Sequence, residues 1–154
     1  MSHLNLAVLI SGQGSNLQAL IDACAQEHFP AKIVLVISNN PDAYGLQRAR
    51  DAGIKAVVIN HKDFMKRSEF EAEIQATLDK QPIDLICLAG FMRILTAKFV
   101  ESWPDRILNT HPSLLPKFGG EGMYGMNVHK AVIDAGEAET GCSIHYVIPE
   151  VDQG

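Results

Sequence analysis

The sequence predicts an α/β domain with a largely parallel sheet and helices on both faces. Two observations carry this prediction. Continuous apolar runs, such as residues 6–10 and 33–37, are typical of strands that are covered on both faces of a parallel sheet. Segments with apolar residues at three- and four-residue spacing alternate with these runs, as crossover helices do.

The expected elements follow one another along the chain. Apolar runs predict strands at residues 6–10, 33–37, 56–59, 83–89 and 107–110, and an alternating run predicts a half-exposed, edge-like strand at 142–148. Helical spacing and helix-ending residues predict helices at residues 17–24, 43–52, 70–78, 96–102 and 128–135. Residues 117–126 are rich in glycine and follow neither period, so we expect a loop there.

Composition limits the classes of protein to consider. The 154 residues, 47% of them apolar, suffice for one core, so we expect a single domain over residues 1–154. A net charge of -5 argues against a protein that grips nucleic acid or an anionic membrane. No run resembles a signal peptide or a membrane span, so we expect a cytoplasmic protein. Cys24, Cys87 and Cys142 suit buried thiols, and no spacing supports a metal site.

The first strand leads into a tight glycine loop, Gly12-Gln13-Gly14-Ser15-Asn16, before the first helix. Backbone N–H groups at the positive end of that helix predict a phosphate site at Gly14, Ser15 and Asn16. A dinucleotide site is a weaker alternative, because Leu17 replaces the third glycine and no carboxylate ends the second strand. A structural turn without a ligand remains the third interpretation.

The fifth strand delivers a carboxamide, Asn109, and an imidazole, His111, two residues apart. Strand alternation places both side chains on one face, where both can donate to one developing oxyanion. Pro112 then ends the strand. No nucleophile elbow surrounds Ser113, which argues against an acyl-enzyme hydrolase. A lone histidine in a strand is more often a hydrogen-bonded structural residue than a catalyst, so His145 is interpreted as a structural histidine.

Four segments together resemble the folate-dependent formyltransferases, and within them the phosphoribosylglycinamide formyltransferases of purine synthesis. The segments are Ser11-Gly12-Gln13-Gly14-Ser15-Asn16, Ala89-Gly90-Phe91-Met92-Arg93-Ile94-Leu95, Asn109-Thr110-His111-Pro112-Ser113-Leu114-Leu115-Pro116 and Val151-Asp152-Gln153-Gly154. They occur in the family's order and spacing over essentially the whole chain. The resemblance implies a Rossmann-like fold and transfer of a formyl group from 10-formyltetrahydrofolate to phosphoribosylglycinamide, without a metal.

The resemblance also implies three sets of site residues. The catalytic set is Asn109, His111 and Asp152, in which Asp152 would pair with the imidazolium. The phosphate set is Gly14, Ser15 and Asn16. The folate set is Arg67, Met92, Arg93, Ile94, Leu95 and Asn109. On sequence alone, Asp152 would otherwise be an ordinary acidic residue near a chain end.

Two features depart from the family's pattern. The loop at residues 117–124 is longer than the usual version, and members continue past the aspartate loop with another strand and a long helix. We therefore expect a C-terminally truncated domain and a weak enzyme when this piece stands alone. A formyltetrahydrofolate deformylase, a methionyl-tRNA formyltransferase and a non-catalytic folate- or phosphate-binding module remain alternatives. A homodimer is compatible with the resemblance.

Overall fold

The computed structural model describes residues 3–120, 122–124 and 126–154. Its internal packing divides the chain into two compact units, Met1–Arg93 and Ile94–Gly154. The N-terminal unit contains the glycine loop and the first part of the expected folate segment. The C-terminal unit contains the expected catalytic residues.

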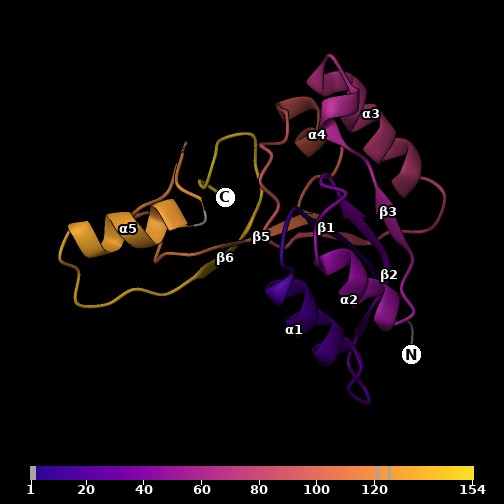
Figure 1. The fold of residues 1–154 in the computed structure, drawn as a ribbon, viewed down its shortest axis with the longest axis horizontal. Helices are drawn as coiled ribbons and strands as arrows, with labels where there is room; N and C mark the ends of the chain where they lie inside the picture. Colours follow the sequence, from indigo (N-terminus) through magenta and orange to yellow (C-terminus); the bar gives the residue numbers. More distant parts are fainter. Residues whose placement is uncertain (1–2, 121, 125) are drawn as a thin grey trace. The chain divides into compact units, whose positions relative to one another are not determined.

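The N-terminal unit is built on four parallel strands in the order β3-β2-β1-β4 (Figure 1). Their bounds are Leu4–Ile10 for β1, Ala31–Ser38 for β2, Ala56–Val58 for β3 and Leu85–Leu88 for β4. The chain runs outward from β1 to β3 and then returns to place β4 on the other side of β1. Ligands of such sheets bind beyond the carboxyl ends of the strands where the order reverses. The loop after β1 and the segment after β4 both lie at this switch point.

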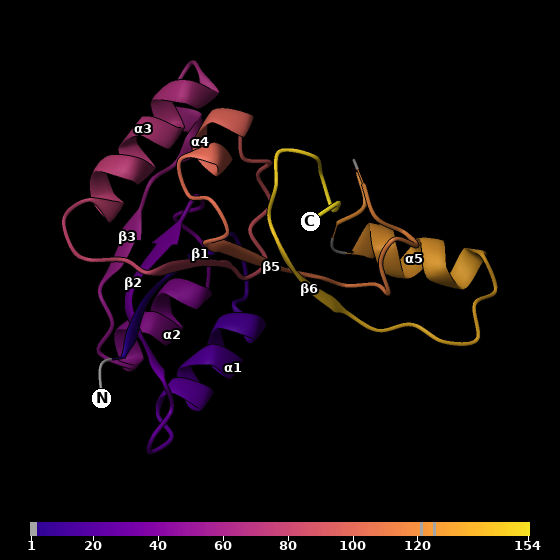
Figure 2. The same ribbon diagram turned by 180° about the vertical axis from the view of Figure 1, so that it is seen from behind.

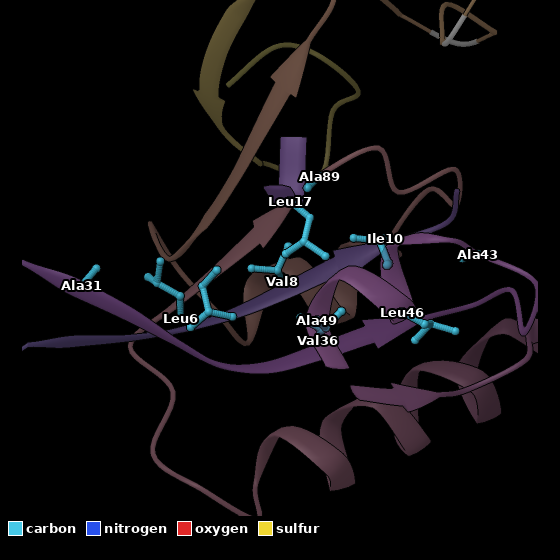
Figure 3. Packing of buried hydrophobic residues seen from close by; sticks show 11 residues of the cluster. Leu6, Val8, Ile10, Leu17, Ala31, Val36, Ala43, Leu46, Ala49 and Ala89 are labelled. Carbon is cyan, nitrogen blue, oxygen red and sulfur yellow. The ribbon is translucent and has the colours of Figure 1, made fainter. Parts of the chain in front are cut away.

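Helices cover both faces of these strands. In Figures 1 and 2, α1 (Ser15–Cys24) and α2 (Gly45–Asp51) lie together on one side, and α3 (Arg67–Leu78) lies on the other. A short 3₁₀ turn, η1, spans His61–Asp63. Figure 3 shows Leu17 of α1 beside Val8 of β1, and Leu46 of α2 belongs to the same buried cluster. The intervening residues of β1, Ala7 and Leu9, are also fully buried. This two-sided burial is why β1 reads as an unbroken apolar run.

The C-terminal unit contains α4 (Ala97–Glu101), β5 (Ile107–His111), α5 (Met126–Asp134) and β6 (Ser143–Tyr146). Strands β5 and β6 pair antiparallel. The Thr96 hydroxyl caps α4 by accepting the Phe99 N–H. Ile144 and Tyr146 of β6 are exposed at 72% and 52%, whereas Ser143 and His145 are half-buried. The predicted alternation of this strand is therefore confirmed.

The fold class predicted from the sequence is confirmed. Apart from the 3₁₀ turn η1, which was not predicted, the differences lie at the ends of elements. Helix α1 begins two residues before the first apolar residue of its pattern, because Gly14 supplies its N-cap. Helix α3 begins at Arg67, three residues ahead of its first apolar residue. Polar first turns carry no periodic signal, so the apolar pattern cannot locate them. Among the described residues, no helix is both long and apolar enough to cross a membrane.

The prediction of three buried thiols is wrong. Cys142 is exposed, and Cys24 and Cys87 are half-buried. Desolvation raises the pKa of Cys87 to about 11, and the negative charge of a Cys24 thiolate adds to that shift. Desolvation also raises the pKa of Cys24. The thiols therefore differ in reactivity, because the thiolate is the nucleophile.

We expect a thiol reagent such as iodoacetamide to modify Cys142 first and Cys87 last at pH 8. Between pH 8 and pH 10 the pH stays below the pKa of Cys87, which is about 11. The thiolate fraction of Cys87, and with it the labelling rate, should therefore rise roughly tenfold per pH unit in this range. Mass spectrometry of the labelled peptides over time measures all three rates, with urea-unfolded protein as the control. Equal labelling of Cys87 and Cys142 in the folded protein would contradict the burial of Cys87.

Candidate active site

Strand β5 presents Asn109 and His111 on one face. The two residues are two positions apart, and their antiparallel partners on β6 are His145 and Ser143. Directly paired residues of antiparallel strands share a face, so His145 joins Asn109 and His111 there. His111 is 3% exposed. The expectation that Asn109 and His111 share a face is confirmed.

The His111 imidazole lies between two acceptors. Its Nδ1 atom is 3.5 Å from Oδ1 of Asp152, and its Nε2 atom is 2.8 Å from the Phe118 carbonyl oxygen. The side chains of His111 and Asp152 are only 4% and 9% exposed, so water screens their interaction weakly. The Phe118 carbonyl can only accept a hydrogen bond, so Nε2 is the donor in that contact, whereas the contact between Nδ1 and the carboxylate is an ion pair when the imidazole is charged.

Asp152 also anchors the glycine-rich loop that follows β5. Its Oδ2 atom accepts the Gly120 N–H at 2.7 Å. A Cβ on Gly119 would lie 2.7 Å from Leu115 Cδ2 and 3.3 Å from Asp152 Cβ, so the loop passes close to the carboxylate. Asp152 has a φ of 58°, a left-handed conformation that Asp tolerates better than most residues. The carboxylate thus contacts both His111 and the loop. An ordinary acidic residue near a chain end would be expected to lie exposed, without such contacts.

His145 is a site residue that the sequence interpretation missed. Its Nε2 atom is 3.3 Å from Nδ2 of Asn109 and 3.7 Å from Oδ1 of Asp152. Its side chain is 8% exposed. The only signal in the sequence is that His145 occupies an alternating strand, and the register that places it opposite Asn109 appears only in the structure.

The glycine loop after β1 is held by its carbonyl groups. Three consecutive carbonyl oxygens accept hydrogen bonds within the N-terminal unit: Gly12 from the Gly45 N–H at 3.0 Å, Gln13 from Arg48 Nε at 2.8 Å and Gly14 from the Gln18 N–H at 2.8 Å. Gly14 has a φ of 77°, and a Cβ there would lie 2.7 Å from Gly45 Cα. The first N–H groups of a helix have no partner within it. The loop thus has the backbone arrangement on which the predicted phosphate site at Gly14, Ser15 and Asn16 rests, and that site stays a prediction.

The segment after β4 is tied to the loop after β1 by a partly buried hydrogen bond to Ser11. The Ser11 hydroxyl accepts the Met92 N–H at 2.8 Å and donates to Asn39 Oδ1 at 2.5 Å. The Asn39 amide lies 3.1 Å from His61 Nδ1. Ser11 and Asn39 are 9% and 4% exposed. The hydroxyl therefore fixes the backbone of the expected folate segment relative to the expected phosphate loop.

The remaining predicted folate residues differ in burial. Arg67 is exposed at the start of α3, and Met92 is 47% exposed. The Nε atom of Arg93 is buried, and it has no hydrogen-bond partner in the part of the chain that the structure describes. Ile94 is 45% exposed, whereas Leu95 is 7% exposed and offers a ligand mainly its backbone.

The chain is similar to known proteins over almost its whole length. A model of the formyl transferase family matches residues 4–154. The chain is 49% identical to the phosphoribosylglycinamide formyltransferase of Haemophilus influenzae, over 97% of this chain and 68% of that protein. This chain belongs to the formyl transferase family.

Two further similar proteins are longer than this chain. It is 53% identical to the trifunctional purine biosynthetic protein adenosine-3 of Drosophila melanogaster, and it spans 11% of that protein's length. The crystal structure of glycinamide ribonucleotide transformylase 1 from Symbiobacterium toebii superposes with a TM-score of 0.91 at 39% identity. That comparison covers 99% of this chain and 69% of the solved chain.

We expect Ser11→Ala to loosen the Met92 segment of this formyl transferase. The substitution leaves the Met92 N–H and Asn39 Oδ1 without their shared partner, which should lower the free energy of unfolding by about 1–3 kcal/mol. Amide exchange at Met92 should accelerate, and urea unfolding measures the stability change. Ser68→Ala, at an exposed serine on α3, is the matched control. Unchanged exchange at Met92 would contradict the role of the hydroxyl.

Proposed function

We propose that this chain transfers the formyl group of 10-formyltetrahydrofolate to the amine of 5-phosphoribosylglycinamide. The observation that carries the proposal is the Asn109 amide and the His111 imidazole on one face of β5, with the Asp152 carboxylate 3.5 Å from the imidazole. Membership of the formyl transferase family supports it. So do the names of relatives in Haemophilus influenzae and Escherichia coli, both called phosphoribosylglycinamide formyltransferase.

The residues of β5 supply the donors that this reaction needs. Direct attack of the amine on the formyl carbon places negative charge on the formyl oxygen, in a tetrahedral intermediate. Asn109 Nδ2 and His111 can both donate to that oxygen, and donors preorganised in a dry site are worth far more than donors in water. Collapse of the intermediate breaks the bond from the formyl carbon to the folate nitrogen and expels tetrahydrofolate. The charged imidazole, held by Asp152, gives a proton to that leaving nitrogen directly or through water, and the attacking nitrogen, which is positively charged after attack, returns a proton to the imidazole.

His111 has to exchange partners during this reaction. Its Nε2 atom is engaged with the Phe118 carbonyl at 2.8 Å, and its Nδ1 atom faces Asp152. The nitrogen that faces away from the carboxylate is the one that can reach a substrate oxygen. We therefore propose that the Phe118 carbonyl releases His111 when the formyl oxygen takes its place, so that one acceptor replaces another.

The two substrates would be held mainly by backbone groups. We propose that the N–H groups of Gly14, Ser15 and Asn16 bind the phosphate of the ribosyl substrate, supported by the fixed carbonyls of their loop. Met92, Arg93, Ile94 and Leu95, together with Arg67 and Asn109, would contact the folate. The buried Nε of Arg93 has no hydrogen-bond partner among the described residues. This supports a role as a donor to an oxygen of the bound folate.

The proposal also covers the domain and its setting. We propose that residues 1–154 act as one formyltransferase domain, supported by a family match over residues 4–154. The cytoplasmic location, a reaction without a metal and a homodimer stay predictions. So does the weak activity expected of this piece alone.

Release of tetrahydrofolate from 10-formyltetrahydrofolate, measured with and without phosphoribosylglycinamide, tests the function. Release that requires the glycinamide supports the transferase. Release without it would indicate hydrolysis and contradict the proposal, as would formylation of methionyl-tRNA. Binding of both substrates by this chain without any release would indicate a non-catalytic binding module.

A further inference from the structure

We propose that His145 is a positioning residue that sets the orientation of the Asn109 carboxamide. The inference rests on the proposed function only for its effect on rate, because the positioning itself is a property of the free protein. His145 does not need to touch either substrate to act in this way.

The cross-strand register brings the two side chains together. Asn109 of β5 and His145 of β6 are direct antiparallel partners, with Nδ2 and Nε2 3.3 Å apart. The His145 side chain is 8% exposed, so few waters can replace its contacts. Asp152 Oδ1 lies 3.7 Å from the same Nε2 atom, beyond hydrogen-bond length. Asn109 is therefore the closer partner of this nitrogen.

The second ring nitrogen of His145 indicates which one carries the proton. Nδ1 lies 3.2 Å from the Tyr146 carbonyl oxygen, which can only accept a hydrogen bond. In the neutral ring, a proton on Nδ1 leaves Nε2 as a bare acceptor that faces Asn109. The partner that suits it is an N–H of the Asn109 amide, not the amide oxygen.

This contact decides how Asn109 serves an oxyanion. The two ends of a carboxamide have nearly the same size, and a half-turn exchanges the NH₂ group for the oxygen. An oxygen aimed at the developing charge would repel it, whereas an N–H would stabilise it. When His145 accepts one N–H of Nδ2, it disfavours the turned amide and leaves the second N–H for the substrate. The structure thus assigns His145 a role that acts through Asn109.

Two substitutions at His145 separate this role from packing. His145→Leu keeps the bulk and removes the acceptor, and we expect kcat to fall about tenfold, with KM for either substrate changing less than about twofold. His145→Gln places a carbonyl oxygen near the position of Nε2 and should restore most of kcat. His129→Leu, at an exposed histidine of α5, is the matched control and should leave kcat unchanged.

A double-mutant cycle with Asn109→Ala tests whether His145 acts through the amide. In the Asn109→Ala background, His145→Leu should cost little further activity, because the group it orients is gone. Equal losses in both backgrounds would overturn the proposal. So would equal activity of the Leu and Gln variants.

Nitrogen-15 NMR of the free protein gives a readout that needs no activity. We expect His145 to have a protonated Nδ1 and a bare Nε2, and the Asn109 side-chain amide signals to shift in His145→Leu but not in His129→Leu. A proton on Nε2 would overturn the positioning role, even if His145→Leu failed to fold. Absence of formyl transfer by the wild-type chain would instead count against the proposed function, and the NMR result would still decide the positioning.

Discussion

Asn109→Ala should lower the turnover of formyl transfer by roughly a hundredfold or more, because removal of one oxyanion donor costs on the order of 2.7 to 4 kcal/mol in comparable sites. The loss should fall on kcat more than on KM, since the donor matters most when charge develops on the formyl oxygen. Steady-state kinetics with both substrates measures this split.

The neighbouring residue on the same strand provides the control for Asn109. Thr110 lies between Asn109 and His111, so strand alternation points its side chain to the opposite face. Thr110→Ser should keep near-normal turnover, which would show that β5 tolerates a small change. Turnover of Asn109→Ala within a few-fold of the wild type would contradict the assignment of Asn109 as an oxyanion donor.

Asp152→Asn should also lower turnover strongly. We expect the activation free energy to rise by about 3 kcal/mol, which corresponds to a loss of roughly a hundredfold in turnover. The carboxylate lies 3.5 Å from His111 in a contact that is nearly dry, so a neutral amide cannot balance a charged imidazole there. Asn keeps the shape, tolerates the left-handed φ of 58° and can still accept the Gly120 N–H. The substitution therefore isolates the effect of charge.

Asp152→Ala removes the loop contact as well and separates the two roles of the residue. Its turnover should be no higher than that of Asp152→Asn, and amide exchange at Gly120 should accelerate only in the alanine variant. Asp134→Asn, at an exposed acid of α5, removes the same charge without a neighbouring histidine contact and serves as the control. If Asp152→Asn and Asp134→Asn had equal turnover, the ion pair would have no catalytic role.

The arrangement of elements was predictable because buried positions are mostly occupied by apolar residues, so the pattern of burial appears in the sequence. Strand β1 is covered on both faces and therefore shows as a run of five apolar residues, and β6 shows as an alternation because only one of its faces is covered. The shared face of Asn109 and His111 follows from the two-residue period of any strand. Helix ends were less predictable, because caps such as Gly14 depend on backbone conformation.

The parts of the site that were missed depend on contacts between distant residues. His145 meets Asn109 across 36 positions of sequence, and the register of that pairing leaves no local signal. Phe118 contributes a backbone carbonyl to His111, which any residue type could supply. Asp152 was assigned to the catalytic set only by the resemblance, because nothing in its neighbouring sequence indicates that role. The exposure of Cys142 was missed because an apolar pattern does not reveal which face of an edge-like strand is covered.

The glycine loop after β1 also bears on how an anion would bind. Because the carbonyls of Gly12, Gln13 and Gly14 are all engaged, a peptide-plane flip there would break a hydrogen bond each time. The N–H dipoles therefore hold their direction before any anion arrives, and the free energy of orienting them is part of folding and not of binding. Such a loop should bind phosphate with little reorganisation, and backbone positions at residues 12–14 should coincide in free and phosphate-bound crystals.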